Sequence, residues 1–162
     1  MLAQEAADNS ATVARHLPYL RRYARALTGN QTSGDQYAVA VLESIVADPR
    51  VLSSHGDSKV SLFSVFHSIW STSGAPVAEA DDAISGAAQA HMAGLTLNSR
   101  EALLLNTVEG FDQAEVAAIM GVGVGEAQHL IDVAVQEMER SVRGSVLVIE
   151  DEAIIAMDIE AI

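Results

Sequence analysis

The chain of 162 residues is 49% apolar and 19% charged, and it contains no cysteine. This composition suits one domain or two small ones with a hydrophobic core, and it excludes collagen-like, low-complexity and generally disordered chains. The lack of cysteine excludes a disulfide scaffold, thiolate metal sites and a cysteine nucleophile. The stretch from Met1 to Ser10 is acidic and no apolar run approaches the roughly 20 residues that span a bilayer, so we expect a cytoplasmic protein without a membrane partner.

The net charge of −13 is unevenly distributed along the chain. Residues 1–75 carry six basic and six acidic side chains, whereas residues 76–162 carry three basic and sixteen acidic ones. Nucleic-acid binding depends on Lys and Arg that displace counterions from phosphates. The charge therefore favours a basic or apolar partner over DNA.

Three segments of the first half have apolar residues at helical spacing, and they lie within residues 17–27, 37–46 and 62–70. Pro18 suits the first turn of the first helix, Gly29 is expected to close that helix, and Asp48-Pro49 to end the second. The third segment is the most aromatic part of the chain. We expect residues 16–72 to form a small helical module, preceded by an N-terminal extension over residues 1–15.

The composition changes to Ala, Ser, Gly and Asp over residues 73–94, which predicts a linker with a weak helix near residues 81–92. A second helical module is expected over residues 95–143. In the tail, residues 144–162, Val146–Ile149 is a short apolar run typical of a buried strand. A lone parallel-type strand cannot bury itself, so we interpret the tail as the truncated start of a further domain.

The second module has stronger helix signals. Asn98 followed by Glu101 predicts an N-cap with its reciprocal acid, and Asp112 followed by Glu115 repeats the pattern. The helix after Asp112 is short and ends at a glycine, and a last helix is expected from about Gly125 to Arg140. A short helix, a glycine turn and a longer helix are typical of a helix-turn-helix.

The stretch Leu97–Met138 reads LNSREALLLNTVEGFDQAEVAAIMGVGVGEAQHLIDVAVQEM and resembles region 4 of extracytoplasmic-function sigma factors. The matching positions are Glu101, Gly110, Glu115, Ala118, Gly121 and Gly125. Residues 16–70 are similar, more faintly, to region 2. Since the tail is similar to the first strand and acidic pair of a receiver, the order resembles the PhyR family of response regulators, which are anti-sigma-factor antagonists of the general stress response. The resemblance implies an all-α fold of two modules, followed by a truncated receiver strand.

The last helix departs from the sigma pattern in its surface residues. Its expected core positions are kept at Ala127, Ile131, Ala134 and Met138. The positions where a sigma factor presents Lys, Ser and Arg hold Gln128, His129, Leu130, Val133 and Val135, with Glu126 in place of the helix-opening threonine. An aliphatic side chain cannot replace an arginine that reads guanine or contacts phosphate. We do not expect this helix to bind DNA.

The segment that resembles region 2 also lacks residues through which sigma factors contact polymerase and promoter DNA. Ala38-Val39 replaces a Gln-Glu pair that helps sigma factors dock on polymerase, and serines replace basic residues over Ser61–Ser73. The resemblance therefore implies a sigma-factor mimic that sequesters a small helical anti-sigma factor, called NepR in the family, and releases the true sigma factor. The candidate partner-binding residues are Leu130, Val133, Val135, Glu126, Leu103, Val108, Phe111, Val39 and Phe66.

Control of this binding is implied to lie in the receiver, which masks the sigma-like region until it is phosphorylated. Glu150 and Asp151 match the acidic pair that holds Mg²⁺ in receivers, and the phosphorylated Asp would lie beyond Ile162. In the chain as given the two acids are expected only to cap the strand, and we expect it to hold no cofactor.

Alternatives to this function and to the roles of individual residues remain open from the sequence. A DNA-binding sigma factor or transcription regulator fits the fold but not the charge, and an enzyme lacks a nucleophile–base pair, a cofactor loop or metal-ligand spacing among its histidines. Leu130, Val133 and Val135 are alternatively core residues. Arg21, Arg22 and Arg25 form either a surface patch or intramolecular pairs with the acidic half.

Overall fold

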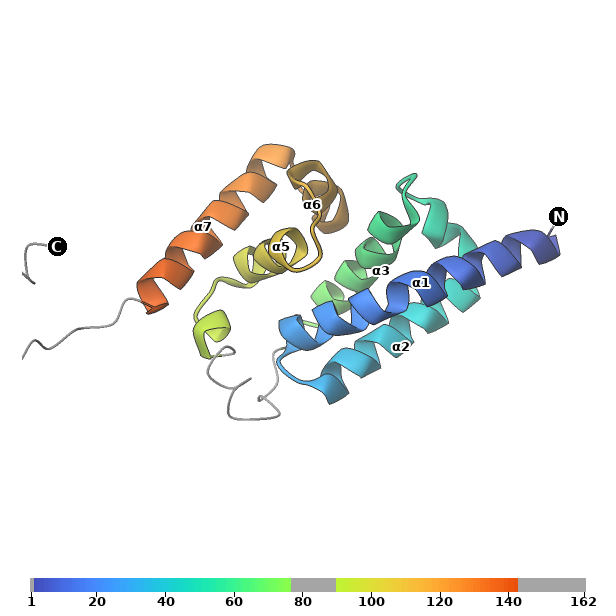
Figure 1. Ribbon diagram of the computed structural model, residues 1–162, viewed down its shortest axis with the longest axis horizontal. Helices are drawn as coiled ribbons and strands as arrows, with labels where there is room; N and C mark the ends of the chain where they lie inside the picture. The colour runs from blue at the N-terminus through green and yellow to red at the C-terminus, as the bar shows by residue number, and fades with distance from the viewer. Residues whose placement is uncertain (1, 77–89, 143–162) are drawn as a thin grey trace, which may run out of the picture.

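The computed structural model describes residues 2–76 and 90–142, and these residues form helices joined by turns (Figure 1). The first group of helices comprises α1 (Leu2–Thr28), α2 (Gln31–Ala47), a short 3-10 helix (Pro49–Ser53) and α3 (Ser58–Thr72). The second comprises α5 (Leu97–Thr107), α6 (Gln113–Met120) and α7 (Val124–Val142). The all-α prediction is confirmed for the described residues, and the expected receiver strand lies outside them.

The first two helices form a tight antiparallel hairpin whose ends follow the sequence signals. Gly29 has a φ of 101°, which only glycine adopts without strain, and the Asn30 side chain accepts a hydrogen bond from the backbone N–H of Ser33 at 2.9 Å. Asp48 caps the end of α2 and accepts a hydrogen bond from the backbone N–H of Arg50. The predicted ends of the first two helices are confirmed.

The start of α1 differs from the prediction. The helix begins at Leu2, so Pro18 lies inside it and not in its first turn. Proline removes one hydrogen bond from a helix interior. Val13 and Leu17, which flank this break on the N-terminal side, pack against the core, and their burial offsets that loss.

The second group has the predicted helix-turn-helix. Asp112 and Glu115 form a reciprocal capping box at the start of α6, and Gly121 ends that helix in the left-handed conformation with a φ of 66°. The chain direction turns by 101° between α6 and α7, within the range typical of this motif.

The predicted cap at Asn98 is wrong. Helix α5 starts two residues earlier than predicted, with Thr96 at the N-cap position and no side-chain cap. Glu137 of α7 instead accepts hydrogen bonds from the Thr96 backbone N–H at 3.1 Å and from its hydroxyl at 2.9 Å. Glu101 is buried and contacts the first helical group, so it does not reach back to the N-terminus of α5.

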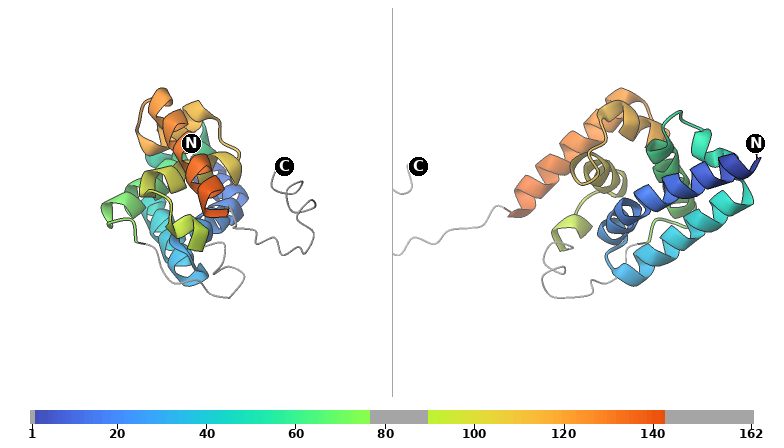
Figure 2. Two further views of the ribbon diagram at one scale, coloured as in Figure 1. Left: turned by 90° about the vertical axis from the view of Figure 1, so that its left-hand side faces the viewer. Right: turned by 45° about the vertical axis from the view of Figure 1, so that its right-hand side comes forward.

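The two helical groups share one hydrophobic core. Figure 2 shows how the helices of the two groups are arranged around it. The Tyr23 ring meets Phe63 in a tilted geometry and Phe66 edge to face, and Phe63 also meets Phe111 of the second group with ring centroids 5.0 Å apart. Residues 90–93 are helical, and the rest of the weak helix predicted in the linker lies outside the described residues. The predicted modules thus pack against each other directly.

Within the described residues, no single helix is both long and apolar enough to cross a membrane. The bent pair Gln113–Met120 and Val124–Ser141 meets that test of length and composition when taken together.

Gly34 allows the close crossing of α1 and α2. A Cβ at this position would lie 2.7 Å from the backbone nitrogen of Arg25, whereas a Cβ at Gly125 in α7 would meet nothing within 4 Å. We expect Gly34→Ala to lower the unfolding free energy by about 1–3 kcal/mol, because the helices must separate. The control Gly125→Ala should raise it by roughly 0.5 kcal/mol through helix propensity. Urea unfolding followed by circular dichroism measures the unfolding free energy of both variants. Equal changes in the two would contradict a close crossing of α1 and α2 at Gly34.

Candidate protein-binding surface

The candidate residues on α7 occupy different flanks of the helix. Leu130 is half-buried and packs against the core, Val133 is half-buried, and Val135 is 42% exposed. Val133 and Val135 are two residues apart, so they point about 160° away from each other. Glu126 is exposed near the N-terminus of the helix. A single partner helix therefore cannot cover both valines at once.

The expected core positions of α7 are largely confirmed. Ala127, Ile131 and Ala134 are buried, and Met138 is half-buried against them. The alternative interpretation as core residues thus applies in part to Leu130 and does not apply to Val135.

Three of the predicted partner-binding residues are buried, contrary to the prediction that they face a partner. Phe66 is 0% exposed, Phe111 2% and Leu103 8%, so none of them is accessible to a partner in this conformation. Phe111 is covered because the two helical groups pack together, whereas Phe66 meets Tyr23 and Tyr37 of its own group. Both are contacts between residues far apart in sequence, which helical spacing does not reveal. Val39 and Val108 are exposed.

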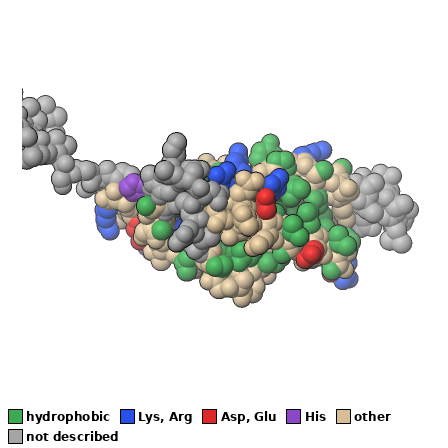
Figure 3. All heavy atoms as spheres, turned by 90° about the horizontal axis from the view of Figure 1, so that it is seen from below, with side chains coloured by type: hydrophobic (Ala, Val, Ile, Leu, Met, Phe, Trp, Pro, Cys, Tyr) green, Lys and Arg blue, Asp and Glu red, His purple; other side chains and the backbone are tan. Residues whose placement is uncertain are grey.

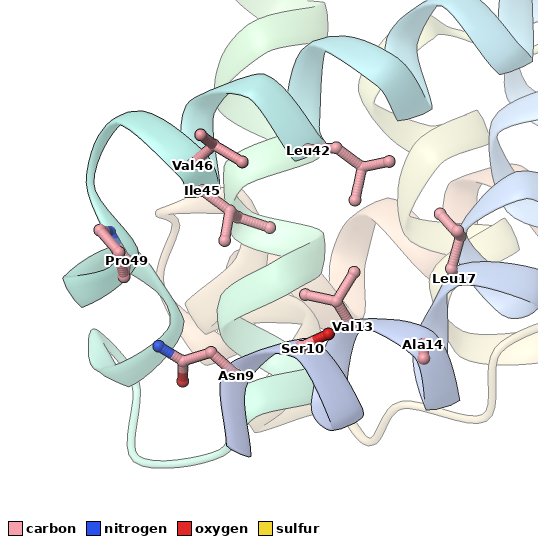
Figure 4. Close-up of a pocket in the computed structure, with 9 residues that line it drawn as sticks. All are labelled: Asn9, Ser10, Val13, Ala14, Leu17, Leu42, Ile45, Val46 and Pro49. Atoms are coloured by element: carbon pink, nitrogen blue, oxygen red, sulfur yellow. The ribbon is translucent and has the colours of Figure 1, made fainter. Parts of the chain in front are cut away.

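An apolar groove runs between α1 and α2. Its main cavity has a volume of about 500 Å³, and Figure 4 shows Val13 and Leu17 of α1 facing Leu42 and Ile45 of α2 across it. Val46 at its rim is 81% exposed.

The groove continues along α2 into a smaller cavity of about 300 Å³, which is lined by Leu17, Ala38, Val39 and Leu42 and by the charged pair Arg21 and Asp35. Figure 3 shows the molecule from below the view of Figure 1, from the side on which α2 lies. Apolar side chains gather on this face. Of the residues that line the groove, only Val39 is among the predicted partner-binding residues. The spacing of Val39, Leu42 and Val46 at i, i+3 and i+7 is the signal that marks one helix face.

The basic cluster of α1 forms intramolecular pairs. Arg21 makes a two-fold ion pair with Asp35 of α2 at 2.7 and 2.8 Å. Arg22 makes one with Glu109, which follows α5, at 3.1 and 3.0 Å, and this hydrogen bonding raises the pKa of Arg22. Pairing with the acidic half is therefore confirmed for Arg22.

A buried polar cluster also joins the two groups. The Tyr23 hydroxyl donates to the Glu101 carboxylate at 3.2 Å, and Nδ1 of His67 lies 2.8 Å from the same oxygen. Burial, then the charge of Glu101, raises the pKa of Tyr23 well above its usual value. Arg100 donates to the Ala26 carbonyl at 2.9 Å, and burial lowers the pKa of its guanidinium.

No group of three or more potential metal ligands occurs among the described residues. Glu150 and Asp151, the predicted Mg²⁺ pair, lie outside them.

Two family models match the chain. The sigma2 domain of PhyR matches residues 13–67, and the sigma-like domain of the response regulator PhyR matches residues 92–141. The phyllosphere-induced regulator PhyR of Methylorubrum extorquens is 40% identical over 152 residues, which is 93% of this chain and 56% of the relative.

Solved structures agree with this match. The complex of anti-anti-sigma factor PhyR with anti-sigma factor NepR from Bartonella quintana is 34% identical with a TM-score of 0.74, covering 94% of this chain and 58% of that one. A crystal structure of the same Bartonella protein, described as PhyR, has a TM-score of 0.62 at 34% identity, covering 94% of this chain and 56% of that one. The PhyRSL–NepR complex from Sphingomonas sp. Fr1 is 33% identical with a TM-score of 0.71, covering 88% of this chain and 96% of that one.

Fold and matches together define the sigma-factor-like region of a response regulator. The chain belongs to the PhyR family. It spans little more than half the length of the Methylorubrum and Bartonella relatives.

The exposure pattern of α7 predicts which substitutions the fold tolerates. Ile131→Arg places a charge in the core and should abolish cooperative unfolding or lower its free energy by more than about 3 kcal/mol. Val135→Arg should change it by less than roughly 0.5 kcal/mol, because this position faces solvent. Chemical unfolding of the two variants compares them directly, and similar losses would show that α7 is buried on both faces.

Proposed function

We propose that this chain is a sigma-factor mimic that captures a NepR-like anti-sigma factor and thereby releases the true sigma factor. The Bartonella and Sphingomonas relatives were solved in complex with NepR, which supports the same class of partner here. The observation that carries the proposal lies in α7. Its core side is kept by Ala127, Ile131 and Ala134, while its other positions lack basic DNA-reading residues. The proposed role is regulatory binding without catalysis.

The alternative of a DNA-binding sigma factor is opposed by where the arginines lie. Residues 98–140 contain two basic side chains, Arg100 and Arg140. Arg100 is 1% exposed and bonds to the first helical group, so it is not available to phosphates. One exposed cation among eight acidic residues is a poor match to a polyanion.

Two surfaces suit the proposed partner. The groove between α1 and α2 has an apolar lining of the kind that accepts an amphipathic helix, and Val39 and Val46 at its edge are exposed. The flank of α7 that carries Leu130 and Val133 is the second. A helical partner that contacts both groups would recognise sigma-like shape through apolar contacts.

The control mechanism of the longer protein is part of the proposal. In it, Glu150 and Asp151 would hold Mg²⁺ through carboxylate oxygens, the ligands this ion prefers. The receiver would mask the sigma-like region until phosphorylated, as part of two-component signalling in the cytoplasm.

The proposal predicts selective binding. In calorimetry and gel-shift assays the chain should bind a NepR-like anti-sigma factor without phosphorylation and should not shift promoter DNA at physiological salt. Because the second half is acidic, the rate of association with a basic partner should fall as salt rises. Promoter binding, or co-purification with core polymerase in place of the anti-sigma factor, would favour the alternative.

A second prediction tests the α7 flank. Val133→Arg restores the residue type of a sigma factor at a half-buried position that lies off the core stripe. It should weaken anti-sigma binding about thirtyfold, roughly 2 kcal/mol, because a charge is buried against an apolar partner. Gln136→Arg, which adds the same charge at an exposed position of α7, is the control. Equal affinities for Val133→Arg and the unaltered chain would place the contact elsewhere, with the groove of α1 and α2 as the next surface to test.

A further inference from the structure

The connector between α5 and α6, residues Val108–Phe111, lies against the first helical group and is held there by side chains of α1 and α3. Arg22 of α1 donates to the Val108 carbonyl at 3.0 Å and to both oxygens of the Glu109 carboxylate at 3.1 and 3.0 Å. The Glu109 side chain is 0% exposed, whereas that of Arg22 is 53% exposed. A buried carboxylate of this kind needs its charged partner.

Lys59 of α3 holds the connector from the other side. Its ammonium group donates to the Glu109 carbonyl at 2.8 Å and lies 4.1 Å from the ring centroid of Phe111. The Phe111 ring in turn meets Phe63 edge to face, at an interplanar angle of 71°. Gly110, with a φ of 72°, makes the turn that presents both neighbouring residues to the first group.

The connector is therefore one of the contacts that orient the two groups, beside the shared core and the Tyr23–Glu101–His67 cluster. The apolar groove lies on the first group and the Val133 flank on the second, so a partner that contacts both depends on that orientation. Binding costs less when the orientation is already set in the free protein. The present arrangement has a TM-score of 0.74 to the Bartonella structure that contains NepR and 0.62 to the Bartonella structure described as PhyR.

We propose that Arg22, Lys59 and Glu109 act as a clasp that sets the two helical groups in the arrangement recognised by the anti-sigma factor. These are positioning residues, and the proposal rests on the function proposed above. Without Arg22, the Glu109 carboxylate would remain buried and unpaired. Movement of the connector away from the first group would return the carboxylate to water, so loss of the clasp favours separated groups.

The chain supplies a matched control for this idea. Arg21 is the next residue of the same helix and makes the same kind of two-fold ion pair, but its partner Asp35 lies within the first group. Arg22→Glu and Arg21→Glu each replace an ion pair by two like charges. Only Arg22→Glu does so between the groups.

The test combines a distance with a binding rate. Since the chain has no cysteine, spin labels at Glu43→Cys on α2 and Glu139→Cys on α7 report the spacing of the groups by double electron–electron resonance. We expect Arg22→Glu to broaden and lengthen the distance distribution and to slow association with a NepR-like protein at least tenfold. Helicity by circular dichroism should be retained, and Arg21→Glu should leave the distance distribution unchanged. Because Arg21 lines the smaller cavity of the groove, this variant is a control for the distances and not for the association rate.

Milder variants cover the case in which Arg22→Glu does not fold. Arg22→Gln should show the same changes to a smaller degree, and Arg22→Lys, which keeps one charged contact, should recover part of the association rate. Unaltered distances in Arg22→Gln would overturn the clasp. So would separated groups that bind the partner at the normal rate. If the unaltered chain itself does not bind a NepR-like protein, the proposed function fails, and the distances then decide separately whether the clasp orients the groups.

Discussion

The burial of α3 between the two helical groups is the constraint on which the rest of the structure depends. Phe63, Phe66 and Trp70 of this helix are almost completely buried, and the helix as a whole packs against α1, α2 and α6. A helix with apolar residues around most of its circumference must be covered on several sides. The first group alone leaves the Phe63 side open, and Phe111 from the second group covers it.

Covering α3 in this way brings acidic residues of the second half against basic residues of the first. Glu101 and Glu109 are buried at this junction, where Tyr23, His67 and Arg22 provide their hydrogen bonds. Two of the sixteen acidic residues in the second half therefore serve the packing of the groups against each other. Because Arg21 and Arg22 are both paired within the chain, the basic cluster of α1 is a structural feature of the fold and a weak candidate for a nucleic-acid site.

Local signals predicted local structure well. Gly29, Asp48 and the Asp112–Glu115 box mark helix ends where the sequence places them, since a turn glycine or a capping carboxylate acts within a few residues of itself. The prediction for Asn98 failed because a residue distant in sequence, Glu137, takes over the hydrogen bonding at the start of α5.

The candidate binding residues also show that local sequence patterns do not reveal contacts between distant parts of the chain. Apolar residues such as Phe66 and Phe111 look alike in sequence whether they face a partner or another part of the chain. Only the tertiary packing distinguishes a buried residue from one that faces a partner, and that packing depends on contacts between residues far apart in sequence. Val39 and Val135 are exposed, as a partner-binding role requires. The groove between α1 and α2 was missed because half of its lining belongs to the segment interpreted as a helix start and extension.

The helix-turn-helix of the second group shows how a fold persists when its original contact chemistry is lost. Its geometry depends on the capping box, on Gly121 and on the buried face of α7, and none of these reads DNA. Replacement of surface arginines by valine or glutamate leaves that framework intact, since substitutions away from the core usually change stability little. Burial of Arg100 goes further, because it turns a cation of the second group into a contact that holds the groups together. The described residues thus keep the helix-turn-helix framework on buried contacts and caps, and under the proposed function the partner is recognised through shape and apolar area.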